Sequence, residues 1–149
     1  MRNIDAKDLR KTAKELKLIG YTKLFITSDE KIERVCNGIG PYFFPGIIRK
    51  LIDRLNPSLI YAAALHDLAY YDGKGTEKDF FNANSALRTN GILLADHNYK
   101  WYDPRRYYVR RQARKFAMLC DSFGWLAYKN AIKEREDWKK GISNRRVEK

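Results

Sequence analysis

Apolar residues recur along most of the chain with the spacing of α-helices. The clearest pattern runs from Leu59 to Tyr71 and is preceded by Asn56-Pro57, a typical cap and first helical residue. We therefore predict a helix over residues 57–71. Its expected inward face consists of Leu59, Ala62, Ala63, His66 and Tyr70.

Two further helices follow this one. Thr76 is expected to cap a helix over residues 76–89, with Phe80, Ala83, Asn84 and Leu87 on one face. Residues 90–102 read as a loop. Asp103-Pro104 then opens a long helix, interrupted but not ended by Gly124 and terminated near Gly141, whose predicted buried stripe is Val109, Ala113, Phe116, Cys120, Phe123 and Ala127.

The first two helices are joined by a short turn containing Gly73 and Gly75, so they should run antiparallel, with the long helix packed across them. In this arrangement His66 and Asn84 both lie on inward faces and can meet. Together these patterns predict a mainly α fold in a single domain spanning residues 1–149.

The N-terminal third is less regular. Residues 5–17 have helical composition, whereas residues 18–27 place β-branched and aromatic residues around a glycine, which is consistent with a short strand or hairpin. Thr27 and Glu30 have the spacing of a capping box and predict a short helix running toward Val35. Residues 47–55 again show helical spacing.

Charge changes this picture, because the net charge is +12 and is unevenly distributed. From Lys100 onward there are fifteen basic and six acidic residues. This excess suits an anionic partner, which could be a phospholipid surface, a nucleic acid or an acidic protein, although a solvated basic helix face would look the same. Two cysteines make no disulfide framework, and although one bridge between Cys36 and Cys120 is compatible with the sequence, we expect two free thiols.

The candidate chemistry lies at His66-Asp67, an ionisable pair inside an apolar helix. Such a pair is costly to bury unless it is partnered or binds a metal. Successive helical residues point about 100° apart, so Asp67 can bind a cation on one side while His66 contacts water on the other. This arrangement suits metal-assisted hydrolysis, in which a cation polarises a carbonyl and a base takes a proton from water. The alternative is a histidine satisfied within the core.

A glycine-containing segment, Cys36-Asn37-Gly38-Ile39-Gly40-Pro41, lies upstream. Glycines allow backbone carbonyls to converge on a cation. Calcium prefers carboxylate and carbonyl oxygens, whereas zinc prefers His and Cys side chains, which are scarce here, so calcium is the predicted metal. Residues 42–45 (YFFP) follow directly, either as core aromatics that anchor the loop or as a membrane-docking rim.

The segments NGIGP, HDLAYY, GTEKDFFNANSAL and RRQARKFAMLCDSFGWLAY resemble the phospholipase A2 superfamily, particularly its compact, disulfide-poor bacterial and viral members. The resemblance covers residues 36–128 and leaves 1–35 as an N-terminal extension and 129–149 as a basic tail. It implies a phospholipase A2-like α fold with an antiparallel helix pair, calcium dependence, and hydrolysis of the sn-2 ester of glycerophospholipids.

The same resemblance assigns the calcium ligands. Asp67 matches the calcium-binding carboxylate, and the backbone carbonyls of Cys36, Gly38 and Gly40 match the loop ligands. The amide of Gly38 matches the donor that stabilises the oxyanion of the tetrahedral intermediate.

It also assigns the catalytic residues, with one departure. His66 matches the general base, and Tyr70 matches the tyrosine that supports the partner of this histidine. Relatives carry aspartate as that partner, whereas this chain has Asn84, which can accept a hydrogen bond from the ring but carries no full charge. Asp79 lies about 140° around the helix from Asn84 and is not expected to substitute. The departure predicts reduced catalytic power.

Three functions follow in order of preference. The first is a calcium-dependent phospholipase that acts on an anionic membrane surface and breaches membranes for a virus or phage. The second is a catalytically weak or inactive scaffold that serves as a structural or interaction protein of a virion. The third is nucleic-acid binding through residues 105–115, which leaves His66-Asp67 unexplained. The charged start predicts no secretory signal, so we expect synthesis in the cytoplasm and delivery with a virion or by a secretion system.

Overall fold

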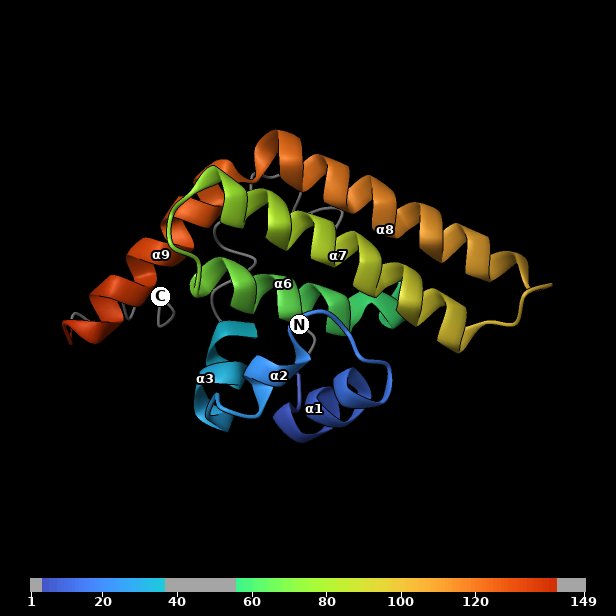
Figure 1. Cartoon of the computed structure of the whole chain (residues 1–149), viewed down its shortest axis with the longest axis horizontal. Coiled ribbons are helices and arrows are strands. Elements are labelled where there is room, and N and C mark those ends of the chain that lie inside the picture. Colours follow the sequence, from blue (N-terminus) through green and yellow to red (C-terminus); the bar gives the residue numbers. More distant parts are fainter. Residues whose placement is uncertain (1–3, 37–55, 142–149) are drawn as a thin grey trace, which may run out of the picture.

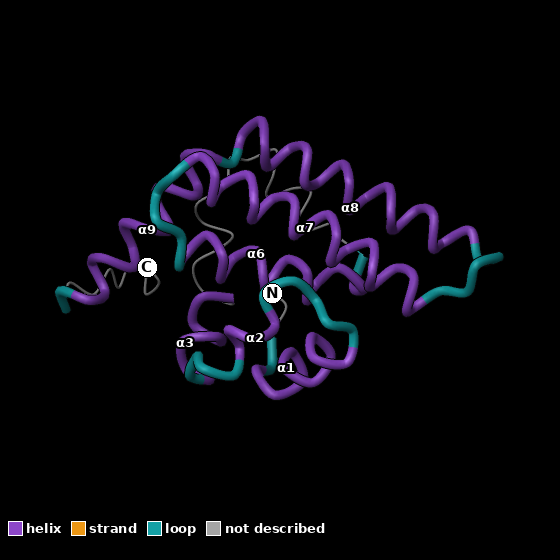
Figure 2. Tube along the Cα trace, viewed as in Figure 1, coloured by secondary structure: helices purple, strands orange, loops and turns teal. Residues whose placement is uncertain are grey.

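The computed structural model describes residues 4–36 and 56–141, and this part of the chain is mainly α-helical. Figure 2 shows helices joined by turns and loops, and within the described residues there is no strand. The elements are α1 (Ala6–Glu15), α2 (Tyr21–Leu24), α3 (Asp29–Arg34), the 3₁₀ turn η2 (Pro57–Leu59), α6 (Ile60–Tyr71), α7 (Glu77–Asn98), α8 (Pro104–Phe123) and α9 (Trp125–Lys139).

The core forms where α7 packs against α6 on one side and α8 on the other (Figure 1). The helices α6 and α7 run antiparallel, as their short connection predicted. The small helices α1–α3 lie below α6 in Figure 1, and α9 bends away from α8 and contacts α6. This packing buries the middle of α6, which carries His66.

Side-chain caps begin three of these elements at the positions that the sequence indicated. Asn56 accepts a hydrogen bond from the amide of Ser58, and Thr76 accepts one from the amide of Asp79. Asp103 caps α8 in the same way. Each cap satisfies a backbone donor that has no partner within the helix. The one difference is that residues 57–59 form a 3₁₀ turn before α6 begins.

The predicted loop over residues 90–102 is wrong over most of its length, because α7 continues to Asn98. Asn90 is buried and uses its amide on both backbone groups of Ile19, accepting from the N–H at 2.7 Å and donating to the carbonyl at 3.1 Å. A Cβ on Gly91 would lie 2.5 Å from the Cβ of Ala113, so glycine permits the close approach of α7 and α8. His97 consequently lies exposed in the last turn of α7 and not in a loop.

The continuous long helix that we predicted is also wrong, since α8 ends at Phe123 and α9 starts at Trp125. A Cβ on Gly124 would lie 2.5 Å from the carbonyl oxygen of Cys120 and 2.7 Å from the hydroxyl of Tyr70. The break therefore brings backbone close to the inward face of α6. The break also changes which side chains face the core. Phe123, which we expected on the buried face of the long helix, is 51% exposed.

The strand or hairpin expected over residues 18–27 is wrong as well. This segment forms the single helical turn α2, preceded by Gly20 with a φ of 93°. Leu18 and Leu24 are fully buried, so the segment contributes its apolar side chains to the core without forming a ladder. Arg10 binds it to α1 by donating to the carbonyls of Leu24 and Thr27.

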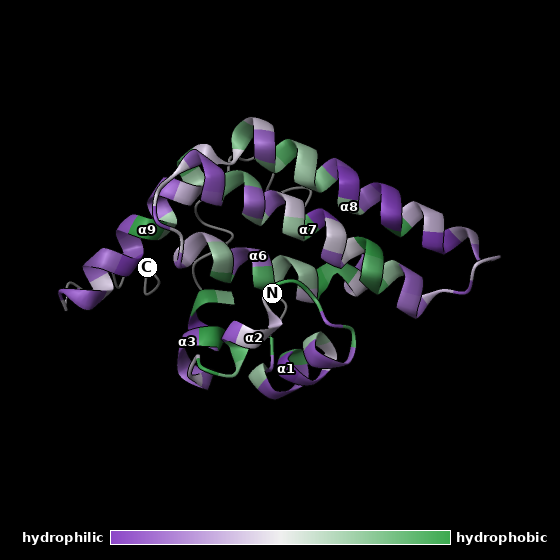
Figure 3. Cartoon of the chain, in the orientation of Figure 1, coloured by the Kyte–Doolittle hydropathy of each residue, from purple (hydrophilic) through white to green (hydrophobic). Residues whose placement is uncertain are grey.

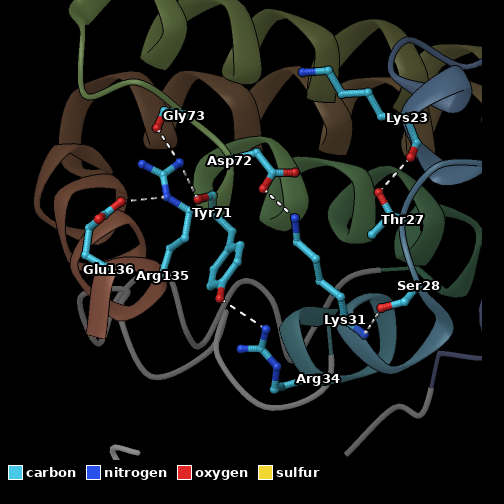
Figure 4. A network of polar contacts seen from close by, with 10 residues as sticks. All are labelled: Lys23, Thr27, Ser28, Lys31, Arg34, Tyr71, Asp72, Gly73, Arg135 and Glu136. Carbon is cyan, nitrogen blue, oxygen red and sulfur yellow. Dashed lines mark hydrogen bonds and ion pairs between the residues drawn. The ribbon is translucent and has the colours of Figure 1, made fainter. Parts of the chain in front are cut away.

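The predicted start of α3 is shifted by one residue. Ser28, and not Thr27, is the N-cap, because its hydroxyl accepts a hydrogen bond from the amide of Lys31. The Thr27 hydroxyl instead donates to the carbonyl of Lys23 (Figure 4). The helical pattern over residues 47–55 lies outside the described residues.

Hydropathy follows this packing. In Figure 3 the first half of α8 is mostly hydrophilic, in keeping with its run of arginine residues. Among the described helices, none combines the length and apolar character that crossing a bilayer requires. The thiols of Cys36 and Cys120 are free, as predicted.

Candidate active site

The structure brings His66 and Asn84 together across the interface of α6 and α7. The imidazole is almost fully buried, with 3% of the residue exposed, and its Nε2 lies 2.8 Å from Asn84 Oδ1. Both residues sit on the apolar faces that pack the two helices together. Antiparallel packing of two correctly assigned faces was therefore enough to predict this contact.

Asn84 is the centre of a larger hydrogen-bond network. Its Oδ1 also accepts from the hydroxyl of Tyr70 at 2.7 Å, and its Nδ2 donates to Asp121 Oδ1 at 2.9 Å. A carboxylate only accepts hydrogen bonds, so Asp121 determines which end of the amide faces it. Oδ1 must then face the ring, and His66 donates from Nε2. This arrangement selects the tautomer with its proton on Nε2 and its lone pair on Nδ1.

Asp121 is the site residue that sequence reasoning missed. It follows Cys120, a member of the predicted buried stripe of α8, and it is exposed while still reaching the buried amide of Asn84. The sequence signal that could have identified Asp121 is its position directly after Cys120, on the predicted buried face of the helix. Asp79, the carboxylate that we had considered, instead accepts a hydrogen bond from the amide of Lys74 at 3.1 Å and does not replace the missing aspartate.

Burial sets the electrostatics of this network. Desolvation lowers the pKa of His66 to about 4, and the hydrogen bond with Asn84 partly opposes that decrease. Desolvation raises the pKa of Tyr70, so its phenol stays protonated and donates to Asn84. The imidazole is therefore a neutral base at pH 7, although a weak one.

The titration of His66 is directly testable. Because burial penalises the imidazolium, the ring should stay neutral as the pH falls from 7 and become protonated only around pH 4. We expect the ¹⁵N and ring ¹³C signals of His66 to show the Nε2–H tautomer at pH 7. The spectrum of the His66→Gln variant would identify these signals. A midpoint close to that of an unperturbed imidazole would show that the ring is solvated and not buried.

Asp67 lies beside this network without joining it. Its nearest carboxylate oxygen is 4.0 Å from His66 Nδ1, and its side chain is 17% exposed. Desolvation raises the pKa of its carboxyl group well above the ordinary value. A carboxylate held in such a place is stabilised by a cation, and its hard oxygen atoms suit calcium.

Cys36, the first residue of the predicted calcium loop, contacts α6 at Ala64, three residues before Asp67. Its Sγ lies 3.6 Å from the carbonyl oxygen of Ala64 on α6. Burial raises the pKa of the thiol, and the charge of Asp67 raises it further. The other predicted loop residues, Gly38 and Gly40, lie outside the described residues. Within the described ranges, no three His, Cys, Asp or Glu side chains group as a metal site.

A pocket of about 500 Å³ between α2, α6 and α7 extends to His66. Asp67 is not among the described residues that line it. Charged residues, among them Lys23 and Lys74, also line this pocket. The apolar lining includes Ile19, Leu24, Leu65, Leu68, Ala83 and Leu87.

Comparison of the chain with protein-family models, curated proteins and solved structures found no match. The resemblance of its motifs to phospholipases A2 therefore stays a prediction. What the structure adds is the arrangement of His66, Tyr70, Asn84 and Asp121, which can orient a neutral imidazole for proton transfer.

Proposed function

We propose that this protein hydrolyses the sn-2 ester of glycerophospholipids in a calcium-dependent reaction, with His66 as the general base. The observation that carries the proposal is the chain of hydrogen bonds from His66 through Asn84 to Asp121, reinforced by Tyr70. A general base needs a defined tautomer and orientation, and these contacts supply both.

In this proposal Asn84 holds the Nε2 proton, and the lone pair on Nδ1 takes a proton from water. The water oxygen attacks the ester carbonyl carbon and forms a tetrahedral intermediate. The intermediate breaks the bond to the sn-2 oxygen of glycerol, which takes the proton from Nδ1 of His66, so that a fatty acid and a lysophospholipid leave and the imidazole is neutral again. Asn84 does not contribute a full charge to the imidazolium that forms. Asp121 accepts a hydrogen bond from the amide of Asn84, so its negative charge acts on the imidazolium through Asn84 and not by direct contact.

Asp67 would hold calcium together with the backbone carbonyls of Cys36, Gly38 and Gly40. The bound ion would polarise the ester carbonyl and stabilise negative charge on its oxygen. The amide of Gly38 is the proposed second donor to that oxygen. The partial burial of Asp67 and the contact of Cys36 with Ala64 on the same helix support this assignment.

The surroundings of His66 suit a lipid substrate. The pocket that reaches the imidazole exposes more apolar than polar surface, and the apolar part would accommodate part of an acyl chain. The net charge of +12 would favour an anionic phospholipid surface.

A second candidate function is a scaffold without efficient catalysis that serves as a structural or interaction protein of a virion. Two observations favour it. Asn84 occupies the place of a charged partner, and burial lowers the pKa of His66 to about 4, which makes the imidazole a weak base. In both functions the described fold and the network around Asn84 are the same.

The test is fatty-acid release from mixed phosphatidylcholine and phosphatidylglycerol vesicles, measured in calcium and in a calcium chelator. We expect release only in calcium, and we expect Asp67→Asn to reduce the rate about a hundredfold or more because it removes the charged ligand. Asp8→Asn, an exposed change on α1, is the matched control and should retain the native rate.

Calcium binding without measurable release would favour the scaffold over the enzyme. Release that is equal in calcium and in chelator would overturn the metal-assisted mechanism. The absence of both calcium binding and release would contradict the proposed site.

A further inference from the structure

A second pocket lies between α3, the end of α6 and α9 (Figure 4), and neither His66 nor Asn84 lines it. We call it the α3–α9 basic pocket. It has a volume of about 500 Å³, and its lining includes Lys31, Arg34, Tyr71, Arg135, Trp138 and Lys139. Two acidic residues, Glu30 and Asp72, also line it, so four cations face two anions.

Arg34 is held in this pocket by two aromatic rings. Its guanidinium carbon lies 3.9 Å from the ring centroid of Trp138 and 5.3 Å from that of Tyr71. Its Nη2 donates to the Tyr71 hydroxyl at 3.1 Å. Stacking and this hydrogen bond fix the plane of the guanidinium before any ligand binds.

The other terminal nitrogen of Arg34, Nη1, is buried and is not hydrogen-bonded by any residue that the structure describes. Leaving a charged donor buried and unpaired is unfavourable, and a ligand that supplies an acceptor relieves that cost. No described acidic side chain forms an ion pair with Arg34, in contrast to Lys31, which pairs with Asp72 at 2.7 Å.

Arg135 forms the opposite wall. Its Nη1 donates to the carbonyls of Tyr71 at 3.0 Å and Gly73 at 2.8 Å, while its Nε pairs with Glu136 at 3.2 Å (Figure 4). These bonds satisfy carbonyls at the C-terminal end of α6 and hold the guanidinium in place. Arg135 thus contributes a fixed positive charge at the backbone end of Tyr71, while Arg34 contributes one at its hydroxyl end.

We propose that the α3–α9 basic pocket binds a phosphate group, with Arg34 as its principal ligand. A phosphate oxygen accepts a hydrogen bond from Nη1, and the planar guanidinium matches phosphate geometry. Lys31, Arg135 and Lys139 supply the surrounding positive charge. The phosphate can belong to a lipid headgroup or to a soluble compound. Phosphate binding here does not depend on the proposed hydrolysis, because it involves other residues.

Phosphate binding can be measured by titrating inorganic phosphate at constant ionic strength and following the indole ¹H–¹⁵N signal of Trp138. We expect a saturable shift of this signal. Arg34→Gln should weaken the affinity at least tenfold, and Arg34→Lys should recover only part of it, because lysine keeps the charge but loses the planar fork. Arg111→Gln, an exposed change on α8, is the control and should bind as the native protein does.

Circular dichroism establishes that each variant is folded. Lys139→Gln tests the pocket independently, since Lys139 is exposed, and should weaken binding about threefold. A signal of Trp138 that does not saturate with phosphate would overturn the proposal. So would equal affinities in the native protein, Arg34→Gln and Lys139→Gln.

Two further titrations identify the source of the phosphate. Tighter binding to phosphatidic-acid vesicles than to glycerol phosphate, lost in Arg34→Gln but not in Arg111→Gln, would identify a lipid headgroup. Equal or tighter binding of soluble glycerol phosphate, with the same dependence on Arg34, would identify a soluble ligand. Either result supports the pocket, and neither requires the protein to hydrolyse lipid.

Discussion

Replacing His66 with glutamine is expected to lower calcium-dependent fatty-acid release by about 10²–10⁴-fold, the usual contribution of a general base. Glutamine can still donate a hydrogen bond to Asn84, so the contact between α6 and α7 is largely retained. It offers no basic nitrogen in place of Nδ1, and water is no longer deprotonated at that position. Initial rates on mixed phospholipid vesicles provide the measurement.

The matched control for this change is His97→Gln. His97 is exposed in the last turn of α7, and its replacement should leave the rate at the native level. If the His66→Gln protein is folded and hydrolyses as fast as the native protein, then another group activates the water. That result would remove the imidazole from the mechanism and leave it as a core residue hydrogen-bonded to Asn84.

Exchanging the amide and the carboxylate of the network, in Asn84→Asp combined with Asp121→Asn, is expected to raise the rate about tenfold or more. The carboxylate introduced on α7 would then accept directly from His66 and stabilise the imidazolium with a full charge. The amide introduced on α8 would donate to that carboxylate and keep the 2.9 Å contact satisfied from the other side. Rates and the midpoint of thermal unfolding should be measured for both single variants and the double variant.

The two single variants distinguish the effect of a charged partner for His66 from the effect of orienting the side chain at position 84. Asn84→Asp alone places a second carboxylate against Asp121, and repulsion should lower stability and keep one of the two groups protonated, so the gain in rate is largely lost. Asp121→Asn alone removes the group that orients the amide and should lower the rate. A double variant that is folded and no faster than the native protein would mean that the missing charge does not limit catalysis.

Several features followed from local sequence patterns. The caps at Asn56, Thr76 and Asp103 and the antiparallel pairing of α6 with α7 depend on nearest-neighbour rules and on a short connection. The contact between His66 and Asn84 followed from these two helices, because each residue lies on an apolar stripe. Their placement needed no knowledge of the rest of the chain.

Other features could not be read from local patterns. Asn90 and Gly91 looked like loop residues, yet α7 continues through them because Asn90 binds the backbone of Ile19 and Gly91 packs against Ala113. At Gly124, between α8 and α9, a side chain would collide with the hydroxyl of Tyr70, which is far away in sequence. At Asn90 and Gly91 these long-range contacts outweighed the local preference of a polar residue and a glycine. At Gly124 the break agrees with the low helix propensity of glycine.

By itself, the sequence determined the helical class, the main helix starts and the facing positions of His66 and Asn84, since these depend on spacing and on short-range hydrogen bonds. Only the tertiary structure decided which carboxylate binds the amide of Asn84, how strongly burial lowers the pKa of His66, and that Arg34 packs against the rings of Tyr71 and Trp138. Orientation, desolvation and stacking arise where helices distant in sequence pack together, so no single segment encodes them.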